Sequence, residues 1–163
     1  MSSQDMNWFR RGGIADPGDP QSTDEALTLF ADPDYCVRYL TFRRWPGGNV
    51  TCPVCGGSNL TWLARRRMWE CRNKHPHAQF SVRSGTFMED SRVTLGQWLL
   101  AVWLLAERKL TISSYELARR IGVTQKSGWL MLRRIRKALA QAGAEAYSAP
   151  GPPSLSATAS GAS

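Results

Sequence analysis

Cys52-Pro53-Val54-Cys55-Gly56 is the stretch of sequence that decides how this chain folds. Two residues between the cysteines allow both sulfur atoms to converge on one metal ion, and the following glycine permits a tight turn that aims backbone N–H groups at them. Because a tetrahedral site needs four ligands, further ligands have to come from elsewhere in the chain. Cys71 follows after 15 intervening residues, which is long enough for a hairpin. We therefore predict a structural zinc site that includes Cys52, Cys55 and Cys71.

The fourth ligand is predicted to be a histidine that closely follows Cys71. His75 has the Cys-x-x-x-His spacing and is the first choice, while His77 and an open or water-filled position remain the alternatives. A redox Cys-x-x-Cys pair is disfavoured because no βαβ pattern surrounds it, and a catalytic zinc because Glu70 is the only acid near the cysteines. Cys36 lies outside this spacing, in a predicted helix, and is interpreted as a small buried hydrophobic residue.

Short β-like stretches surround the cysteines and predict a small antiparallel ribbon. They span residues 60–63, 68–71 and 79–82. Upstream, Ser22 or Thr23 can cap one helix, because both side chains can accept from the free N–H groups of a first turn. Pro33 can open a second helix, which ends at the Trp-Pro-Gly-Gly of residues 45–48. A short helical segment is therefore expected before the ribbon.

Three helices are predicted after the ribbon. Thr94 caps a strongly apolar helix that runs to about residue 107. Ser113 or Ser114 caps a shorter one, and Thr124 opens the longest, which runs to about residue 140. Gly122 lies in the turn between the last two helices, and this order is that of a helix-turn-helix.

Apolar spacing predicts which faces of these helices point inward. The inward residues are Leu117, Ala118 and Ile121 on the second helix and Trp129, Leu132, Ile135 and Leu139 on the third. Trp98 and Trp103 on the first helix are interpreted as core rather than as a platform for bases. Gly128 either marks the close approach of another helix or weakens its own helix, and the sequence leaves both readings open.

The whole chain has a net charge of +8 and a pI of about 9.9. Its positive charge is concentrated in the middle of the sequence. No acid occurs between Gln125 and Ala140. A merely solvated helix usually mixes Glu with Lys or Arg, so the third helix is predicted to bind double-stranded DNA, with a plain amphipathic hairpin as the alternative. Base contacts are assigned to the start of this helix, at Gln125, Lys126 and Ser127. Phosphate contacts are assigned further along, to Arg133, Arg134, Arg136 and Lys137.

The motifs resemble, in order, the N-terminal part of zinc-ribbon transposases of the IS1595 type. The resemblance covers about Asp24 to Ala140, and it is carried by the Tyr-Leu and Arg-Trp-Pro-Gly-Gly of residues 39–48, the cysteine knuckle, the Phe-Ser-Val-Arg-Ser-Gly-Thr-Phe of residues 80–87 and residues 113–126. It implies DNA binding at the terminal inverted repeats of a mobile element. No secretory leader is indicated, and the longest strongly hydrophobic run is shorter than the roughly 20 residues of a membrane span. We expect a bacterial cytoplasmic protein associated with the nucleoid, without a membrane partner.

The same resemblance leads us to expect a protein without enzymatic activity. In the family, an RNase H-like domain follows the DNA-binding part, and its carboxylates hold two divalent metals for strand cleavage. After Asp90 this chain has no Asp and only three Glu residues. We therefore interpret it as a truncated insertion-sequence transposase that binds DNA without catalysing transposition or DNA recombination, with an intact transposase as a candidate partner. The alternatives are a transposase subunit complemented by a separate catalytic domain and a host-adopted regulator or protein-interaction module.

Together these patterns predict a small α+β protein, in which a zinc ribbon is followed by a three-helix helix-turn-helix. The predicted segments are a disordered N-terminus (1–21), a helical segment (22–48), the zinc ribbon (49–90), the helix-turn-helix (91–142) and a disordered tail (143–163).

Overall fold

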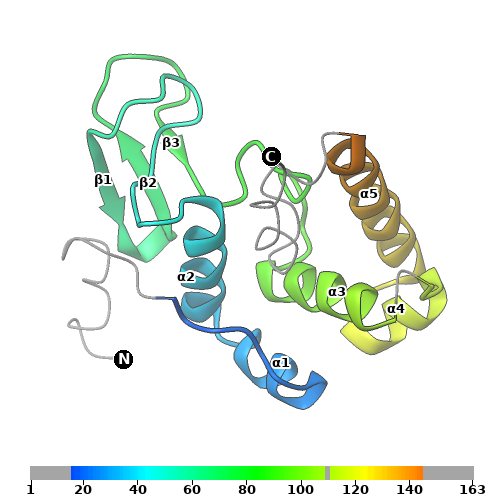
Figure 1. Cartoon of the computed structure of the whole chain (residues 1–163). Coiled ribbons are helices and arrows are strands. Elements are labelled where there is room, and N and C mark those ends of the chain that lie inside the picture. Colours follow the sequence, from blue (N-terminus) through cyan, green and yellow to red (C-terminus); the bar gives the residue numbers. More distant parts are fainter. Residues whose placement is uncertain (1–15, 109–110, 145–163) are drawn as a thin grey trace, which may run out of the picture. The chain divides into compact units, whose positions relative to one another are not determined.

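The computed structural model of the chain describes residues 16–108 and 111–144, with side chains as far as residue 141 (Figure 1). Residues 1–15 and 145–163, which form most of the two termini predicted to be disordered, lie outside the described residues. The chain divides into two compact units. Of the described residues, the first contains 16–18 and Val37–Glu89, and the second contains Asp19–Cys36, 90–108 and 111–144. The predicted helical segment 22–48 is therefore shared between the two units.

The first unit contains a three-stranded antiparallel sheet of order β1-β2-β3 (Figure 1). Its strands are β1 (Leu60–Leu63), β2 (Met68–Cys71) and β3 (Gln79–Phe80). The first two strands match the prediction, but the expectation that the third continues to residue 82 was wrong. Ser81 begins a turn in which the Ser84 N–H donates to the Ser81 carbonyl at 3.1 Å, so pairing stops at Phe80.

An aromatic cluster forms the core of this unit. Trp69 is fully buried, and its ring centroid lies 4.7 Å from that of Trp62 and 5.7 Å from that of Phe80. The three residues share one face of the sheet because Trp69 pairs with Trp62 on one side and with Phe80 on the other. The Trp45 ring completes the cluster, edge-on to Trp69 at 5.6 Å. Such ring pairs add about 0.5–1.5 kcal/mol each beyond their buried area, but the cluster is small.

Helix α2 (Pro33–Arg44) begins at its proline and ends just before the Trp-Pro-Gly-Gly segment, as predicted. Its residues from Val37 onward belong to the first unit. There the Arg44 guanidinium donates to the Val82 carbonyl at 2.8 Å and lies 4.4 Å from the Trp45 ring centroid. The arginine thus ties the end of the helix to the segment that follows β3.

In the second unit, helices α1 (Thr23–Leu29) and α3 (Leu95–Glu107) begin at predicted caps. The Ser22 hydroxyl accepts an N–H of the first turn of α1, and Thr94 forms a reciprocal capping box with Gln97 at the start of α3. Gly96 lets the first turn of α3 approach the segment after α1, because a Cβ at this position would collide with the Phe30 carbonyl.

Helix α3 supplies much of the core of the second unit, and seven of its residues are buried. Trp98 is only 1% exposed, in agreement with its assignment to the core, and Trp103 is half-buried. Among the residues that the structure describes, no helix combines the length and the apolar character that crossing a membrane requires.

Helices α4 (Ser114–Ile121) and α5 (Gln125–Ala144) follow in the same unit (Figure 1). Ser113 caps α4 by accepting the Glu116 N–H at 3.2 Å. Gly122 ends α4 at a φ of +73°, a left-handed conformation that glycine adopts without strain. Leu117, Ala118 and Ile121 are buried as predicted, whereas α5 continues four residues beyond the expected end at residue 140.

The prediction that Trp129 faces inward was wrong, because half of its surface is exposed to solvent. The buried stripe of α5 instead runs through Gly128, Met131, Leu132 and Ile135, and Leu139 is half-buried. A Cβ at Gly128 would lie 2.8 Å from the Ser114 carbonyl oxygen and 2.9 Å from the Ala118 Cβ. The glycine therefore marks a close helix contact, and this contact turns the neighbouring tryptophan outward.

Candidate functional site

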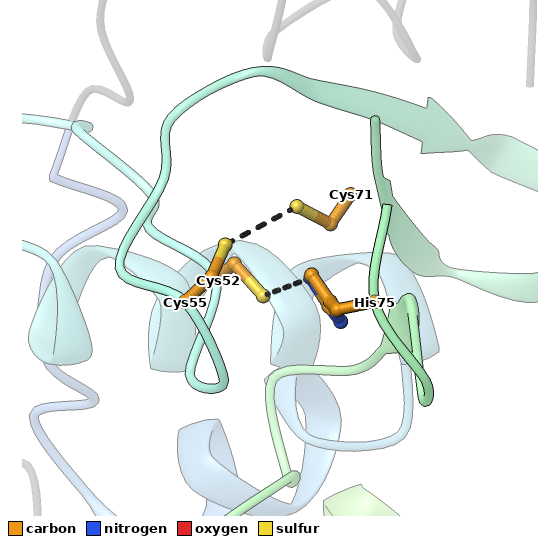
Figure 2. Close-up of side chains that lie close together, drawn as sticks. All are labelled: Cys52, Cys55, Cys71 and His75. Carbon is orange, nitrogen blue, oxygen red and sulfur yellow. Dashed lines mark hydrogen bonds between the residues drawn. The ribbon is translucent and has the colours of Figure 1, made fainter. Parts of the chain in front are cut away.

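Three cysteines and one histidine converge at the open end of the ribbon (Figure 2). The Cys52 Sγ lies 3.5 Å from the His75 Nε2, and the Cys55 Sγ lies 3.6 Å from the Cys71 Sγ. All four candidate ligand atoms lie within 4.8 Å of one another. The first two cysteines come from the knuckle before β1, Cys71 ends β2, and His75 lies in the loop that leads to β3.

The Cys52–His75 and Cys55–Cys71 distances fit one tetrahedral zinc ion. With Zn–S bonds of about 2.3 Å, two thiolates on a tetrahedron lie about 3.8 Å apart, and a thiolate and an imidazole nitrogen lie slightly closer. The observed 3.6 Å and 3.5 Å agree with this geometry. Three thiolates with one imidazole belong to the accepted structural zinc sets, and no position is left over for a substrate. The cluster therefore points to zinc binding of the structural kind.

The knuckle itself is shaped by backbone hydrogen bonds. Gly56 adopts a φ of +70°, and its N–H donates to the Cys52 carbonyl at 2.8 Å. The Gly57 N–H then points at the Cys55 sulfur, 3.4 Å away, as the sequence predicted for a glycine-ended knuckle. Such N–H groups stabilise negative charge on a sulfur that binds a metal.

Asn73 is a residue that the sequence analysis missed. Its side-chain N–H donates to the Cys55 sulfur at 3.3 Å. The hydrogen bonds from Asn73 and from the Gly57 N–H lower the pKa of Cys55 to about 6, which favours the thiolate that a metal needs. Its position between Cys71 and His75 was the only signal in the sequence.

The ring of His75 is oriented by the backbone. Its Nδ1 lies 2.7 Å from the Pro76 carbonyl oxygen, so this nitrogen carries the proton and the Nε2 lone pair is free to face the cysteines. His77, the alternative ligand, is exposed, has a left-handed φ of +57° and is not among the four converging residues. The geometry favours His75.

Cys36 is separate from this cluster, as predicted. It is fully buried, and its Sγ donates to the Phe30 carbonyl at 3.3 Å. Burial, assisted by the nearby Asp32 carboxylate, raises the pKa of its thiol to about 12. A thiol that stays protonated at neutral pH is a poor metal ligand.

The second candidate region is the outer face of α5. The structure places six of the seven residues assigned to DNA on the exposed surface of this helix: Gln125, Lys126, Arg133, Arg134, Arg136 and Lys137. The seventh, Ser127, is half-buried, and its hydroxyl lies 2.9 Å from the Thr124 hydroxyl, which also accepts the Ser127 N–H at 3.2 Å. Ser127 therefore takes part in capping α5.

Arg133 and Arg136 also have partners within the protein. The Arg133 guanidinium carbon lies 5.4 Å from the centroid of the Trp129 ring, a cation–π distance. The Arg136 guanidinium donates to the Ile112 carbonyl at 3.4 Å, which turns it toward the segment before α4. The helix as a whole carries five basic residues and no acid.

Comparison with known proteins assigns part of the chain. No curated protein and no solved structure matches it. One protein-family model does match part of the chain. It describes a zinc-ribbon domain, and no catalytic domain was detected. This match contains α2, the cysteine knuckle and the first hairpin, and it ends two residues before His75. Residues 32–73 match the family model of the transposase zinc-ribbon domain of the IS1595 type, and for this part of the chain the match confirms the resemblance found in the sequence.

Proposed function

We propose that this protein binds duplex DNA through a helix-turn-helix formed by α4 and α5, as the DNA-binding part of an insertion-sequence transposase. The observation that carries the proposal is the outer face of α5, which is exposed, basic and free of acid, in a chain with a transposase zinc-ribbon domain. We propose the terminal inverted repeats of a mobile element as the target.

The connection between the two helices supports this assignment. Three residues, 122–124, join α4 to α5, and both Gly122 and Val123 donate to the Ala118 carbonyl, at 3.0 Å and 3.1 Å. A short turn that contains glycine is typical of helix-turn-helix motifs. The second helix of such a motif contacts base edges with its N-terminal residues. In α5 these residues are Gln125 and Lys126, both exposed.

The charge distribution along α5 supports base contacts at its start and phosphate contacts further along. Backbone N–H groups make the start of a helix slightly positive, and Lys126 adds to this without an opposing acid. Arg133 and Lys137 follow two and three turns later, where flanking phosphates come within reach of long basic side chains. The first unit is expected to add to the electrostatic attraction for DNA, because residues 37–89 contain nine basic and two acidic residues.

The zinc ribbon is proposed to hold one zinc ion through Cys52, Cys55, Cys71 and His75. Its aromatic cluster is small, so metal binding is expected to supply much of its folding free energy, on the order of 10 kcal/mol. We propose DNA binding without strand cleavage. A plasmid-nicking activity that depends on Mg²⁺ or Mn²⁺ and co-purifies with the protein would contradict this part of the proposal.

The proposal is tested by a salt titration of DNA binding. Affinities of the full-length chain for a terminal-repeat duplex and for a scrambled duplex are measured for the wild type, Arg133→Ala and Gln125→Ala. Arg133→Ala should weaken binding to both duplexes alike. It should also lower the slope of log K against log salt by about 0.9, because one phosphate contact is lost. Gln125→Ala should cost about 1–3 kcal/mol on the terminal repeat and little on the scrambled duplex.

Arg120→Ala is the matched control. Arg120 is exposed on α4 and already pairs with Glu116 at 3.2 Å, so its loss should leave the salt slope unchanged. If no duplex is bound near physiological salt, or if Arg120→Ala and Arg133→Ala behave alike, the helix-turn-helix proposal is wrong.

A further inference from the structure

We propose that Trp129 contacts DNA bases directly, by packing its indole ring against the C5-methyl group of thymine in the major groove. The inference rests on the proposed function and adds an apolar contact to a surface that the sequence described as purely basic and polar. Its origin is the outward position of Trp129, which helical periodicity alone had placed in the core.

The exposure of Trp129 follows from the packing of its neighbour. Gly128 lies against the backbone of Ser114 and the side chain of Ala118, so closely that a Cβ would not fit. Successive residues of an α-helix are rotated by about 100°, so a buried stripe that contains Gly128, Met131, Leu132 and Ile135 leaves residue 129 at its edge, where half of the tryptophan is exposed. Met131 and Ile135 continue the buried stripe one and two turns later, at 1% and 2% exposure.

Trp129 lies in the middle of the face assigned to DNA. Lys126 precedes it by three residues and Arg133 follows it by four, spacings that place side chains on one side of a helix. The Arg133 guanidinium stands over the indole ring at 5.4 Å. Leu130, the next residue of the helix, is a second exposed apolar side chain, at 43%. We call Trp129 and Leu130 the apolar ridge of α5.

Charge complementarity selects duplex DNA as the partner of this ridge. An apolar protein surface would have to desolvate Lys126 and Arg133, and charged residues of this kind are depleted from the cores of protein interfaces. Duplex DNA offers phosphates to these cations at the groove edges. Inside the major groove, the thymine methyl is the apolar group that side chains recognise. The ridge lies one turn beyond Gln125, where the next base step would be contacted.

The test removes the methyl group from the DNA and the ring from the protein. The probes are a duplex of alternating adenine and thymine and the same duplex with deoxyuridine in place of every thymidine, which deletes only the C5-methyl groups. The full-length chain is compared with Trp129→Ala, Trp129→Gln and Tyr115→Ala. Tyr115 is the matched control because it is an exposed aromatic residue, 64% accessible, on α4.

The wild type should bind the thymine duplex about fourfold more tightly for each methyl group that is contacted. Both Trp129 variants should bind the thymine duplex roughly tenfold more weakly than the wild type and should lose the preference for thymine over uracil. Their salt slope and melting temperature should not change, since an exposed ring releases no counterion and supports no core. Tyr115→Ala should keep both the affinity and the preference.

Other results overturn the inference. Unchanged affinity and thymine preference in both variants would show that the ring does not touch the bases. A salt slope lowered by about one, without any change in thymine preference, would make Trp129 a positioning residue for Arg133. A lowered melting temperature in both variants would place the ring in the core. If the wild type binds neither duplex, the proposed function itself fails. If the wild type binds and both Trp129 variants bind equally well, only the inference about Trp129 fails.

Discussion

Replacing Gly128 with alanine should destabilise the second unit, although alanine is the better helix former. In an exposed helix interior, this change would stabilise the protein by about 1 kcal/mol. Here the new Cβ would lie 2.9 Å from the Ala118 Cβ, about 0.6 Å inside the roughly 3.5 Å at which carbon atoms normally meet. It would also lie 2.8 Å from the Ser114 carbonyl oxygen. Neither group is the flexible end of a side chain, so α4 and α5 would have to separate.

The size of the effect follows from two opposing contributions. Overpacking of a close contact costs about 1–3 kcal/mol, and the gain in helix propensity offsets about 1 kcal/mol of it. Because both obstacles are rigid, we expect the upper part of the difference, a net loss of about 1–2 kcal/mol. For a domain of this size, each kcal/mol lowers the melting temperature by about 4–8 °C.

Urea unfolding followed by helical circular dichroism, in excess zinc, measures the change. Lys126→Ala is the control, because this exposed residue lies on the opposite side of the same helix and should shift stability by no more than about 0.5 kcal/mol. A Gly128→Ala protein that is about 1 kcal/mol more stable than the wild type would refute the reasoning. It would mean that space exists at this position. The close contact at Gly128 could then no longer explain why Trp129 faces outward.

Three further predictions concern the metal site and the helix caps. The purified protein should contain one zinc per chain, and Cys71→Ser should lose the metal together with the ordered ribbon, which metal analysis and tryptophan fluorescence would report; a well-folded protein without zinc would contradict this. His75→Ala should release zinc to a chelator far more readily than His77→Ala, because only His75 faces the sulfurs, and equal release would restore His77 as a candidate. Thr94→Ala should cost about 1 kcal/mol in urea unfolding by breaking the capping box of α3, in which the Thr94 hydroxyl accepts an N–H at 3.2 Å, and an unchanged midpoint would argue against that box.

Local chemistry allowed much of this structure to be predicted from the sequence. Ser22, Thr94 and Ser113 cap their helices because a hydroxyl can satisfy free N–H groups within one turn, whatever the rest of the chain does. The Cys-x-x-Cys-Gly knuckle likewise forms from a few consecutive residues, with Gly56 in the left-handed region that its turn requires. Such features depend on residues that are neighbours in the chain, so their patterns are legible without a fold.

The choice of the histidine ligand needed the tertiary structure. His75 and His77 both have acceptable spacing, and the one that reaches the sulfurs depends on the path of the loop between β2 and β3. That path is fixed at its ends by the Cys71 N–H, which donates to the Ala78 carbonyl at 2.8 Å. Within it, the Pro76 carbonyl turns the His75 ring, and Asn73 reaches Cys55. None of these contacts has a periodic signature in the sequence.

The outward position of Trp129 also depended on the tertiary structure. The sequence of α5 allows two apolar stripes, one that begins at Trp129 and one that begins at Gly128, and both contain Leu132 and Ile135. Hydrophobicity favours the first, because a tryptophan gains far more from burial than a glycine. The second is formed because α4 presents the small Ala118 and a bare stretch of backbone, so the two helices meet where neither has a bulky side chain. How closely two helices approach is a property of the pair, and the sequence of α5 by itself does not contain it.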